Sequence, residues 1–361
     1  MNTRDVATIR LANQQIADAT STSPAAVVTR LLAIQAQDYR GALWSIGLRM
    51  PGSTIAQIER AIEERSIVRT WPMRGTLHFV AAADVKWMLA LLTPRVMKGS
   101  AGRMRQLEID EAVLSRSRKA FVKALRDGSP LTRAAMYDVL ERAKIAPANQ
   151  RGIHILCRLS QEGLLCFGPH RGTQPTFALL DEWIPSSRSL ARDEALAELT
   201  SRYFRGHGPA TIRDFAWWSG LTLGDARAGV AMLAAELIED QVGGIAYLAS
   251  QNAPDVSAAT RRAARALYLL PGFDEYMLGY ADRGVALDPA NAQDIVPGNN
   301  GMFMPTIVAR GRVIGTWRSV VSRRTRTVTP APFAPLSSSD ARAFATAARR
   351  YEKFLGREPL S

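Results

Sequence analysis

The sequence predicts a mainly α protein with small β elements (α+β), in which three similar segments precede a small C-terminal β-domain with a closing helix. In each of the three segments, apolar residues at helical spacing are followed by two short runs of strand-forming residues joined by turn residues. Past Pro254 the pattern changes to short strands and a loop rich in Pro, Asn and Gly, and the stretch from Ser338 to Leu355 predicts a last helix. The 361 residues suffice to bury a core.

The first segment starts with Ser23 and Pro24, which provide an N-cap and a proline at the first helical position. Apolar residues follow at helical spacing as far as Ile34. A second helix is expected from about Thr54, with isoleucines on one face at 55, 58 and 62. Residues 67–80 predict two strands with a turn near Pro72–Gly75.

The second and third segments repeat this order of elements. The second begins at Leu131-Thr132, with Ala135, Val139 and Leu140 expected to face inward, and it predicts a helix over 152–162, then strands over 165–168 and 176–180. The third begins at Pro209, and Gly243-Gly244 predicts the turn between strands 238–240 and 245–248. Two helices followed by a two-stranded wing form the winged-helix pattern, so the sequence predicts three tandem winged-helix modules. A chain of structural helical modules without DNA contact is the alternative.

The expected domain boundaries follow from these repeats. Residues 1–92 form the first winged helix, 93–128 a basic helical linker, 129–190 the second and 191–253 the third winged helix, and 254–361 the β-rich domain with its final helix. The linker holds nine basic and four acidic residues from 93 to 127, although a solvated helix face would explain this composition equally well.

The charge balance favours a polyanionic partner. Lys and Arg number 46 against 33 Asp and Glu, which gives a formal net charge of +13. Between Ile295 and Ser339 there is no acidic residue, and six arginines lie in that stretch. A ribbon with one sign of charge can grip phosphates, and we predict DNA contacts there from Arg318, Arg323, Arg324 and Arg326. The ordinary alternative for the net charge is an organism whose proteins are generally basic. The ordinary alternative for the arginine-rich stretch is a cluster of turn arginines that binds no ligand.

Several function classes are excluded by what the sequence lacks. No apolar run reaches the roughly 20 residues that a membrane span requires, and Pro94 is expected to end the apolar stretch that starts at Val85. The N-terminus has no secretory core. Two cysteines and four scattered histidines give no disulfide framework and no zinc spacing, so we expect no metal and no cofactor. A cytoplasmic monomer that binds no membrane is the expectation.

Two motifs carry the candidate chemistry. Residues 33–38 read Ala-Ile-Gln-Ala-Gln-Asp and close an apolar helical run, and residues 69–79 read Arg-Thr-Trp-Pro-Met-Arg-Gly-Thr-Leu-His-Phe. A packing helix rarely ends in such a polar cluster. The uncharged amides of Gln35 and Gln37 can orient a water molecule without adding negative charge beside a phosphate backbone.

This pair of motifs resembles the winged-helix DNA glycosylases of the azinomycin-resistance type, whose motif is Gln, an aliphatic residue, then Gln. The resemblance extends along most of the chain. It implies a monofunctional DNA glycosylase that acts on double-stranded DNA with bulky N7-alkylated purines, interstrand crosslinks included. It also implies that Gln35 and Gln37 are catalytic and place water at the anomeric carbon. Ala36 is smaller than the aliphatic residue expected at the centre of the motif.

Geometry alone argues against this assignment. Residues i and i+2 of a regular α-helix point about 200° apart, so the two amides converge only if the helix unwinds near Ala36. Without the resemblance, a surface role for Gln35 and a capping role for Gln37 would be preferred. A neighbouring branch has Asp at the second motif position, but Asp38 is out of register with it and is not expected to be catalytic.

Further site candidates come from the second motif and the C-terminal domain. Arg74 and His78 lie four residues apart on the predicted ribbon and should share a face, where both are candidate DNA contacts, whereas Trp71 and Leu77 look like core. Asp274, Glu275, Asp282 and Arg283 match a family-like pattern, which internal ion pairs explain at least as well as a site does.

The competing function is a non-enzymatic winged-helix transcription regulator. It would share the charge and the modules. Regulators commonly pair one winged helix with a dimerisation or ligand domain, whereas three modules and the absence of a leucine-rich dimer seam favour the monomeric glycosylase.

Overall fold

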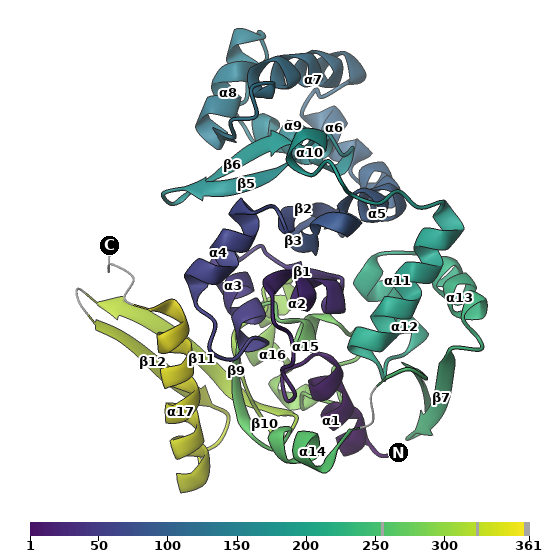
Figure 1. Ribbon diagram of the computed structural model, residues 1–361, viewed down its shortest axis with the longest axis vertical. Helices are drawn as coiled ribbons and strands as arrows, with labels where there is room; N and C mark the ends of the chain where they lie inside the picture. Colours follow the sequence, from purple (N-terminus) through teal and green to yellow (C-terminus); the bar gives the residue numbers. More distant parts are fainter. Residues whose placement is uncertain (254–255, 323–324, 357–361) are drawn as a thin grey trace. The chain divides into compact units, whose positions relative to one another are not determined.

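The computed structural model describes residues 1–253, 256–322 and 325–356 (Figure 1). The chain forms two compact units, and each is described by itself. Unit 1 comprises residues 1–58, 197–218 and 222–361, and unit 2 comprises residues 59–196 and 219–221.

Unit 2 is built around antiparallel strands flanked by helices. Five strands lie in the order β3-β2-β5-β6-β4, and every pairing between them is antiparallel. The strands are β2 (Ile67–Met73), β3 (Thr76–Ala81), β4 (Leu131–Thr132), β5 (Leu165–Arg171) and β6 (Gln174–Leu179). The helices are α5 (Val85–Gly99), α6 (Ala101–Gln106), α7 (Glu111–Leu125), α8 (Arg133–Arg142), α9 (Arg151–Gln161) and α10 (Leu180–Trp183), with a 3-10 turn at Ala82–Asp84.

The core of unit 2 combines aromatic side chains, most of them from the strands, with aliphatic side chains from strands and helices. The ring of Phe167 lies 4.9 Å from that of Trp71 and 4.5 Å from that of Phe177, centroid to centroid. Met136 and Leu156 are fully buried in the same cluster. Burial of such side chains is worth about 1.5–3 kcal/mol each, which makes this layer the main stabilising element of the unit.

Unit 1 up to residue 263 consists mainly of helices, with the very short strand β1 and one hairpin. It contains α1 (Thr3–Asn13), α2 (Pro24–Leu31), β1 (Ala33–Gln35), α3 (Tyr39–Leu48), most of α11 (Arg192–His207), α12 (Ile212–Ser219) up to Trp218, α13 (Leu223–Met232) and α14 (Ala258–Ala263). Strands β7 (Leu237–Val242) and β8 (Ile245–Ser250) form an antiparallel hairpin in this unit. Helix α4 (Ile55–Glu63) crosses from unit 1 into unit 2.

The C-terminal part of unit 1 is an antiparallel sheet in the order β12-β11-β10-β9. Its elements are β9 (Leu267–Leu270), α15 (Glu275–Leu278), α16 (Ala292–Ile295), β10 (Thr306–Ala309), β11 (Arg312–Ser322), β12 (Thr325–Pro332) and α17 (Ser338–Leu355), with 3-10 turns at Pro289–Asn291 and Pro297–Asn299. Helix α17 packs through Tyr351, whose ring lies 5.2 Å from Trp44 of α3 and 5.0 Å from Trp317 of β11.

Most predicted elements are confirmed. Ser23 caps α2 by accepting the N–H of Ala26, and the last helix has the predicted bounds, Ser338–Leu355. Each of the three repeats ends in an antiparallel hairpin, namely β2–β3, β5–β6 and β7–β8. The linker is helical, and its bases are mostly exposed, although Arg118 pairs with Glu162 at 2.7 Å.

One expectation was wrong, and several elements were not predicted. The first helix does not run through Ile34, because Leu32 has a φ of 66° and the chain turns into strand β1. The apolar stretch ends at Pro94 as expected, but the helix does not: Pro94 lies inside α5, which continues to Gly99. Helix α3 and strands β9 and β12 were not predicted. The five-segment division stays a prediction, and the two compact units cut across its first segment at residue 58.

Candidate active site

The Gln-Ala-Gln segment lies on extended backbone between two helices of unit 1. Strand β1 ends at Gln35, and Asp38 is the N-cap of α3, where its Oδ1 accepts the N–H of Gly41 at 3.1 Å. Asp38 therefore has a capping role. In a helix, the side chains of Gln35 and Gln37 would point in nearly opposite directions. Gln35 lies on a strand instead, and alternate residues of an extended chain point to the same side, so that objection does not apply to it. Gln37 lies two residues further, in a bend.

The two glutamines differ in exposure. Gln37 is exposed, as expected for a side chain that meets a substrate. Gln35 is only 7% exposed, so its side chain has little contact with solvent. The burial of Gln35 follows from its place on β1, which is buried at all three positions.

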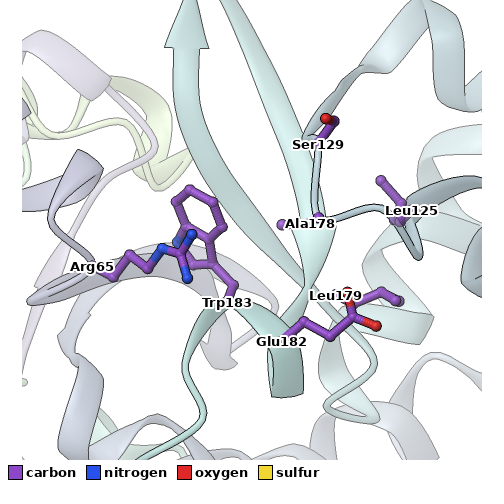
Figure 2. Close-up of a pocket in the computed structure, with 8 residues that line it drawn as sticks. Arg65, Leu125, Ser129, Ala178, Leu179, Glu182 and Trp183 are labelled. Atoms are coloured by element: carbon purple, nitrogen blue, oxygen red, sulfur yellow. The ribbon is translucent and has the colours of Figure 1, made fainter.

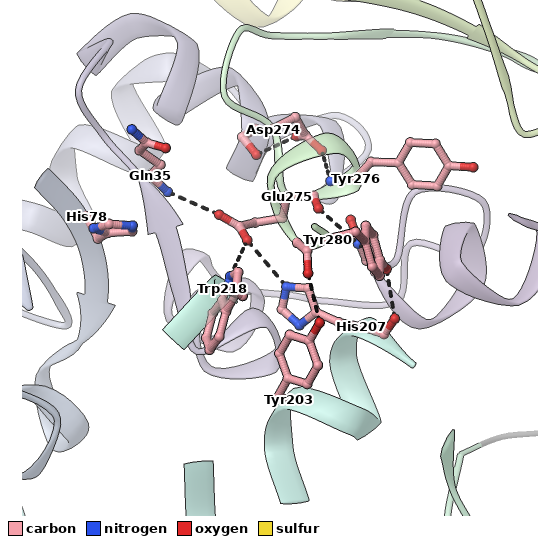
Figure 3. Close-up of polar contacts among 12 residues, drawn as sticks. Gln35, His78, Tyr203, His207, Trp218, Asp274, Glu275, Tyr276 and Tyr280 are labelled. Carbon is pink, nitrogen blue, oxygen red and sulfur yellow. Dashed lines mark hydrogen bonds and ion pairs between the residues drawn. The ribbon is translucent and has the colours of Figure 1, made fainter. Parts of the chain in front are cut away.

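Glu275, the first residue of α15, is the centre of a buried polar cluster beside β1. Its Oε1 accepts the backbone N–H of Gln35 at 3.4 Å, and its Oε2 accepts the indole N–H of Trp218 at 2.8 Å and lies 3.3 Å from Nε2 of His207 (Figure 3). The side-chain amide of Gln35 points away from this carboxylate. Glu275 and His207 have no exposed surface, so the cluster is shielded from solvent.

Tyrosines and Gln14 complete this cluster. The ring of Tyr203 stacks on His207 with centroids 4.8 Å apart, and its hydroxyl donates to the carbonyl of Gly279 at 2.8 Å. The hydroxyl of Tyr280 donates to the carbonyl of His207 at 2.7 Å and accepts from the amide of Gln14 at 3.0 Å. Burial raises the pKa of both Tyr203 and Tyr280, so both remain protonated donors.

Asp274 forms a second buried centre next to Glu275. Arg49 donates to both of its oxygens, at 2.8 and 2.9 Å, and Ser45 donates to Oδ2 at 2.7 Å. Burial alone raises the pKa of Asp274, but the charge of Arg49 and these hydrogen bonds outweigh it and hold the pKa below its ordinary value. An internal ion pair is thus the role of Asp274, and it was one of the two explanations that the sequence left open.

The other members of the family-like pattern have separate roles. Oδ1 of Asp282 accepts the N–H of Gly284 at 2.8 Å. The guanidinium of Arg283 lies 4.9 Å from the ring centroid of Trp217 and 4.8 Å from that of Phe303. Burial lowers the pKa of Arg283.

In unit 2, Arg74 and His78 contact each other as predicted. Nη2 of Arg74 lies 3.3 Å from Nε2 of His78, and Nδ1 of His78 lies 3.0 Å from the carbonyl of Thr76. A proton on Nδ1 satisfies that carbonyl and leaves Nε2 to accept from Arg74. Burial, and then the charge of Arg74, lowers the pKa of His78 well below its ordinary value.

This hairpin is more buried than its alternating pattern suggested. His78 and Thr70 are 0% exposed, and Trp71 and Leu77, the expected core residues, are 7% and 8% exposed. A direct DNA contact from His78 therefore has no exposed surface to support it. Arg74 is half-buried at the two-residue turn, where its φ is 54° and that of Gly75 is 72°. Both positive values fit the turn type that matches the twist of a hairpin.

The C-terminal arginines divide into two groups. Arg318 is exposed on β11, and Arg326 is half-buried on β12, 3.5 Å from Oγ of Ser319. Arg310 instead pairs with Asp340 at 2.8 Å, and Arg312 donates to the carbonyl of Gly284 at 3.0 Å. The six arginines are thus not all available for phosphates. Arg323 and Arg324 lie outside the described residues.

A small cavity in unit 2 is not a binding site for a base. A cavity of about 30 Å³ in unit 2 lies beside Arg65, whose guanidinium is 4.1 Å from the ring centroid of Trp183 (Figure 2). It has room for about one water molecule and none for a nucleobase. Within the described residues, no three His, Cys, Asp or Glu side chains are arranged to hold a metal ion. No helix among them is long and apolar enough to cross a membrane.

Sequence reasoning missed His207, Trp218, Tyr203 and Arg49, and it named Glu275 without a role. The available signal was the pair of acids at 274–275 inside an otherwise apolar stretch, since acids in a buried run must find donors. No local pattern identifies which donors those are.

Comparison with known proteins identifies the family to which this chain belongs. A profile of the AlkZ-like DNA glycosylase family matches residues 28–354. An interstrand DNA cross-link repair glycosylase of Streptomyces sahachiroi is 29% identical over 340 residues, which is 88% of either chain. The solved structure of the Streptomyces sahachiroi DNA glycosylase AlkZ has the same fold, with a TM-score of 0.80 and 24% identity over 99% of this chain and 98% of that one. This chain therefore belongs to the family of AlkZ-like DNA glycosylases, which hydrolyse N-glycosyl bonds.

Proposed function

We propose that this DNA glycosylase hydrolyses the N-glycosidic bond of bulky N7-alkylated purines in double-stranded DNA and unhooks interstrand crosslinks that contain them. The observation that carries the proposal is the Gln35-Ala36-Gln37 segment, in which an exposed amide at 37 follows a strand fixed from behind by Glu275. The relative from Streptomyces sahachiroi, described as an interstrand cross-link repair glycosylase, supports the substrate class.

The chemistry suits amides. An N7-alkylated purine carries a positive charge and leaves as a neutral base, so the reaction needs little general acid. Glycosidases that expel poorer leaving groups use two carboxylates. Here the oxygen of a water molecule bonds to C1′ as the bond from C1′ to the purine nitrogen breaks, and the water's proton passes to solvent. We assign the orientation of this water to Gln37, helped by Gln35, through their carbonyl acceptors.

DNA binding is assigned to arginines of the C-terminal ribbon and of the first hairpin. Arg318 and Arg326, together with Arg323 and Arg324, would grip phosphates of the duplex. Arg74 is the candidate contact at the first hairpin, and His78 would hold its guanidinium rather than contact DNA itself. We further propose that the three helix-and-hairpin repeats are winged helices and that the enzyme acts as a monomer. The family membership removes the basis for the transcription-regulator alternative.

The decisive experiment is incubation of the purified protein with a duplex that carries one defined N7-alkylguanine adduct. Abasic sites are scored by alkaline cleavage, and a matched duplex without the adduct is the control. Release of the adduct, with no release from the control, supports the proposal. A protein that binds both duplexes and releases no adduct would overturn the substrate assignment.

A further inference from the structure

We infer that Glu275 is a positioning residue of the glycosylase reaction, because its carboxylate fixes the backbone of Gln35 and with it the Gln35–Gln37 segment. The inference rests on the proposed function, since it takes these two glutamines as the catalytic pair.

The segment needs an external support. Strand β1 has only three residues, and the residue before it, Leu32, has the left-handed φ of 66°. Glu275, 240 residues further along the chain, lies at the start of a four-residue helix and accepts the N–H of Gln35 at 3.4 Å. This is a long hydrogen bond, but its acceptor is charged and has no exposed surface, where an acceptor is worth more than in water.

Both oxygens of Glu275 act as acceptors. The indole N–H of Trp218 and the backbone N–H of Gln35 are groups that only donate, and each reaches a different oxygen of the carboxylate. An unprotonated carboxylate satisfies both at once. A buried carboxylate is costly unless its donors are held in place, so the arrangement ties β1 to Trp218 of α12 as well as to α15.

His207 supplies the third donor. Its Nε2 lies 3.3 Å from Oε2 of Glu275, whereas Nδ1 is buried and has no hydrogen-bond partner among the described residues. The neutral tautomer with its proton on Nε2 fits both facts, because a protonated ring would bury a second, unpaired N–H. Gly279 permits this packing, since a Cβ there would lie 2.7 Å from Cδ2 of His207.

This donor set makes a specific prediction for Glu275→Gln. The amide keeps one acceptor but turns a hydrogen of its NH₂ group toward either the N–H of Gln35 or that of Trp218, and two donors then face each other. If the amide oxygen stays with Trp218, Gln35 loses its acceptor. We expect the single-turnover rate of adduct release to fall about 10- to 100-fold, as displaced catalytic groups do, while the affinity for adducted DNA changes less than about threefold.

Trp218→Phe provides the rescue. It removes one of the two donors that compete for the amide oxygen, so this oxygen can turn to the N–H of Gln35. The NH₂ group then faces Nε2 of His207, which accepts once the ring's proton has moved to Nδ1. The N–H at Nδ1 is buried without a partner among the described residues, which lowers the stability of the double variant but leaves the acceptor of Gln35 restored. We expect the rate of the double variant Glu275→Gln/Trp218→Phe to return to within about threefold of the rate of Trp218→Phe alone. A role that depended only on the charge of Glu275 would give no rescue.

Tyr276→Phe is the matched control. Tyr276 is the neighbour of Glu275 on α15, is also buried, and donates its hydroxyl to the carbonyl of Gly311 at 2.8 Å, away from β1. Its loss should lower the melting temperature without lowering the single-turnover rate. Thermal unfolding of every variant confirms that the rates compare folded proteins.

The outcomes separate this inference from the proposed function. Slow release by Glu275→Gln, rescued by Trp218→Phe, supports it. Wild-type release by Glu275→Gln, an unrescued double variant, or equal slowing by Tyr276→Phe would overturn it. Gln37→Ala is measured in parallel: if it releases adduct at the wild-type rate, the glutamine assignment itself has failed, whatever Glu275→Gln does.

Discussion

Arg49 and Asp274 are joined by two parallel hydrogen bonds inside unit 1, with Nη1 to Oδ2 at 2.8 Å and Nη2 to Oδ1 at 2.9 Å. Both side chains are 0% exposed. Arg49 follows the last residue of α3, and Asp274 precedes Glu275, the first residue of α15. The pair therefore joins the two helices and fixes α15, whose Glu275 supports β1.

Removal of one partner should be strongly destabilising. Asp274→Ala leaves the charge of Arg49 buried and unpaired, and we expect the free energy of unfolding to fall by about 3–5 kcal/mol in urea titrations. Arg310→Ala is the comparison, because Arg310 is about half exposed in its pair with Asp340, and its loss should cost about 0–1 kcal/mol. Similar losses for the two variants would contradict the assignment.

The same pair predicts a pH dependence. The pKa of Asp274 is lower in the folded protein than the ordinary value of 3.8, so its contribution to stability is present above that value and is lost as pH falls through the folded pKa. The free energy of unfolding should therefore decrease below about pH 4. In Asp274→Asn this part of the decrease should be missing. If the free energy of unfolding of the variant fell below about pH 4 as steeply as that of the wild type, Asp274 would not be the source of the decrease.

The exposed glutamine should separate chemistry from binding. Gln37→Ala is expected to abolish adduct release while leaving DNA affinity nearly intact, because one neutral amide adds little to an affinity carried by phosphate contacts. Gln35→Ala should slow release less and also lower the melting temperature, since Gln35 is buried. Single-turnover assays and binding titrations on the same adducted duplex measure both effects. Weak binding by Gln37→Ala would assign that residue to affinity instead.

Two arginines of the C-terminal sheet should behave differently toward DNA. Arg318→Ala should weaken DNA binding and reduce the slope of log affinity against log salt by about 0.9, the value for one lost phosphate contact. Arg310→Ala should leave the slope unchanged, because Arg310 is engaged by Asp340. Titrations between about 50 and 200 mM salt provide the measurement. Equal slopes for wild type and Arg318→Ala would remove Arg318 from the interface.

Both cysteines should be unreactive in the folded protein. Burial raises the pKa of Cys157 to about 12, and it raises that of the fully buried Cys166 as well. Only the thiolate is nucleophilic, so iodoacetamide at about pH 8 should label neither residue until the protein is unfolded. Rapid labelling of the native protein, detected by intact mass, would show that either site opens.

The sequence by itself determined much of the local structure. The bounds of α17 and the turn at Gly243-Gly244 were both predicted correctly. Helical periodicity, capping and turn preference act between residues a few positions apart, so they can be read without knowledge of the fold. The motif at residues 33–38 was also visible, although its backbone was expected to be helical.

Only the tertiary structure decided how that motif is held. The apolar pattern continues to Ile34, yet the helix ends at Leu31, and the N–H of Gln35 meets the carboxylate of Glu275. Likewise, Arg49 and Asp274 carry no local sign that they are partners. The physical reason is that a buried charge or N–H must be satisfied by whichever group the fold brings within about 3 Å, and that choice depends on where distant parts of the chain cross.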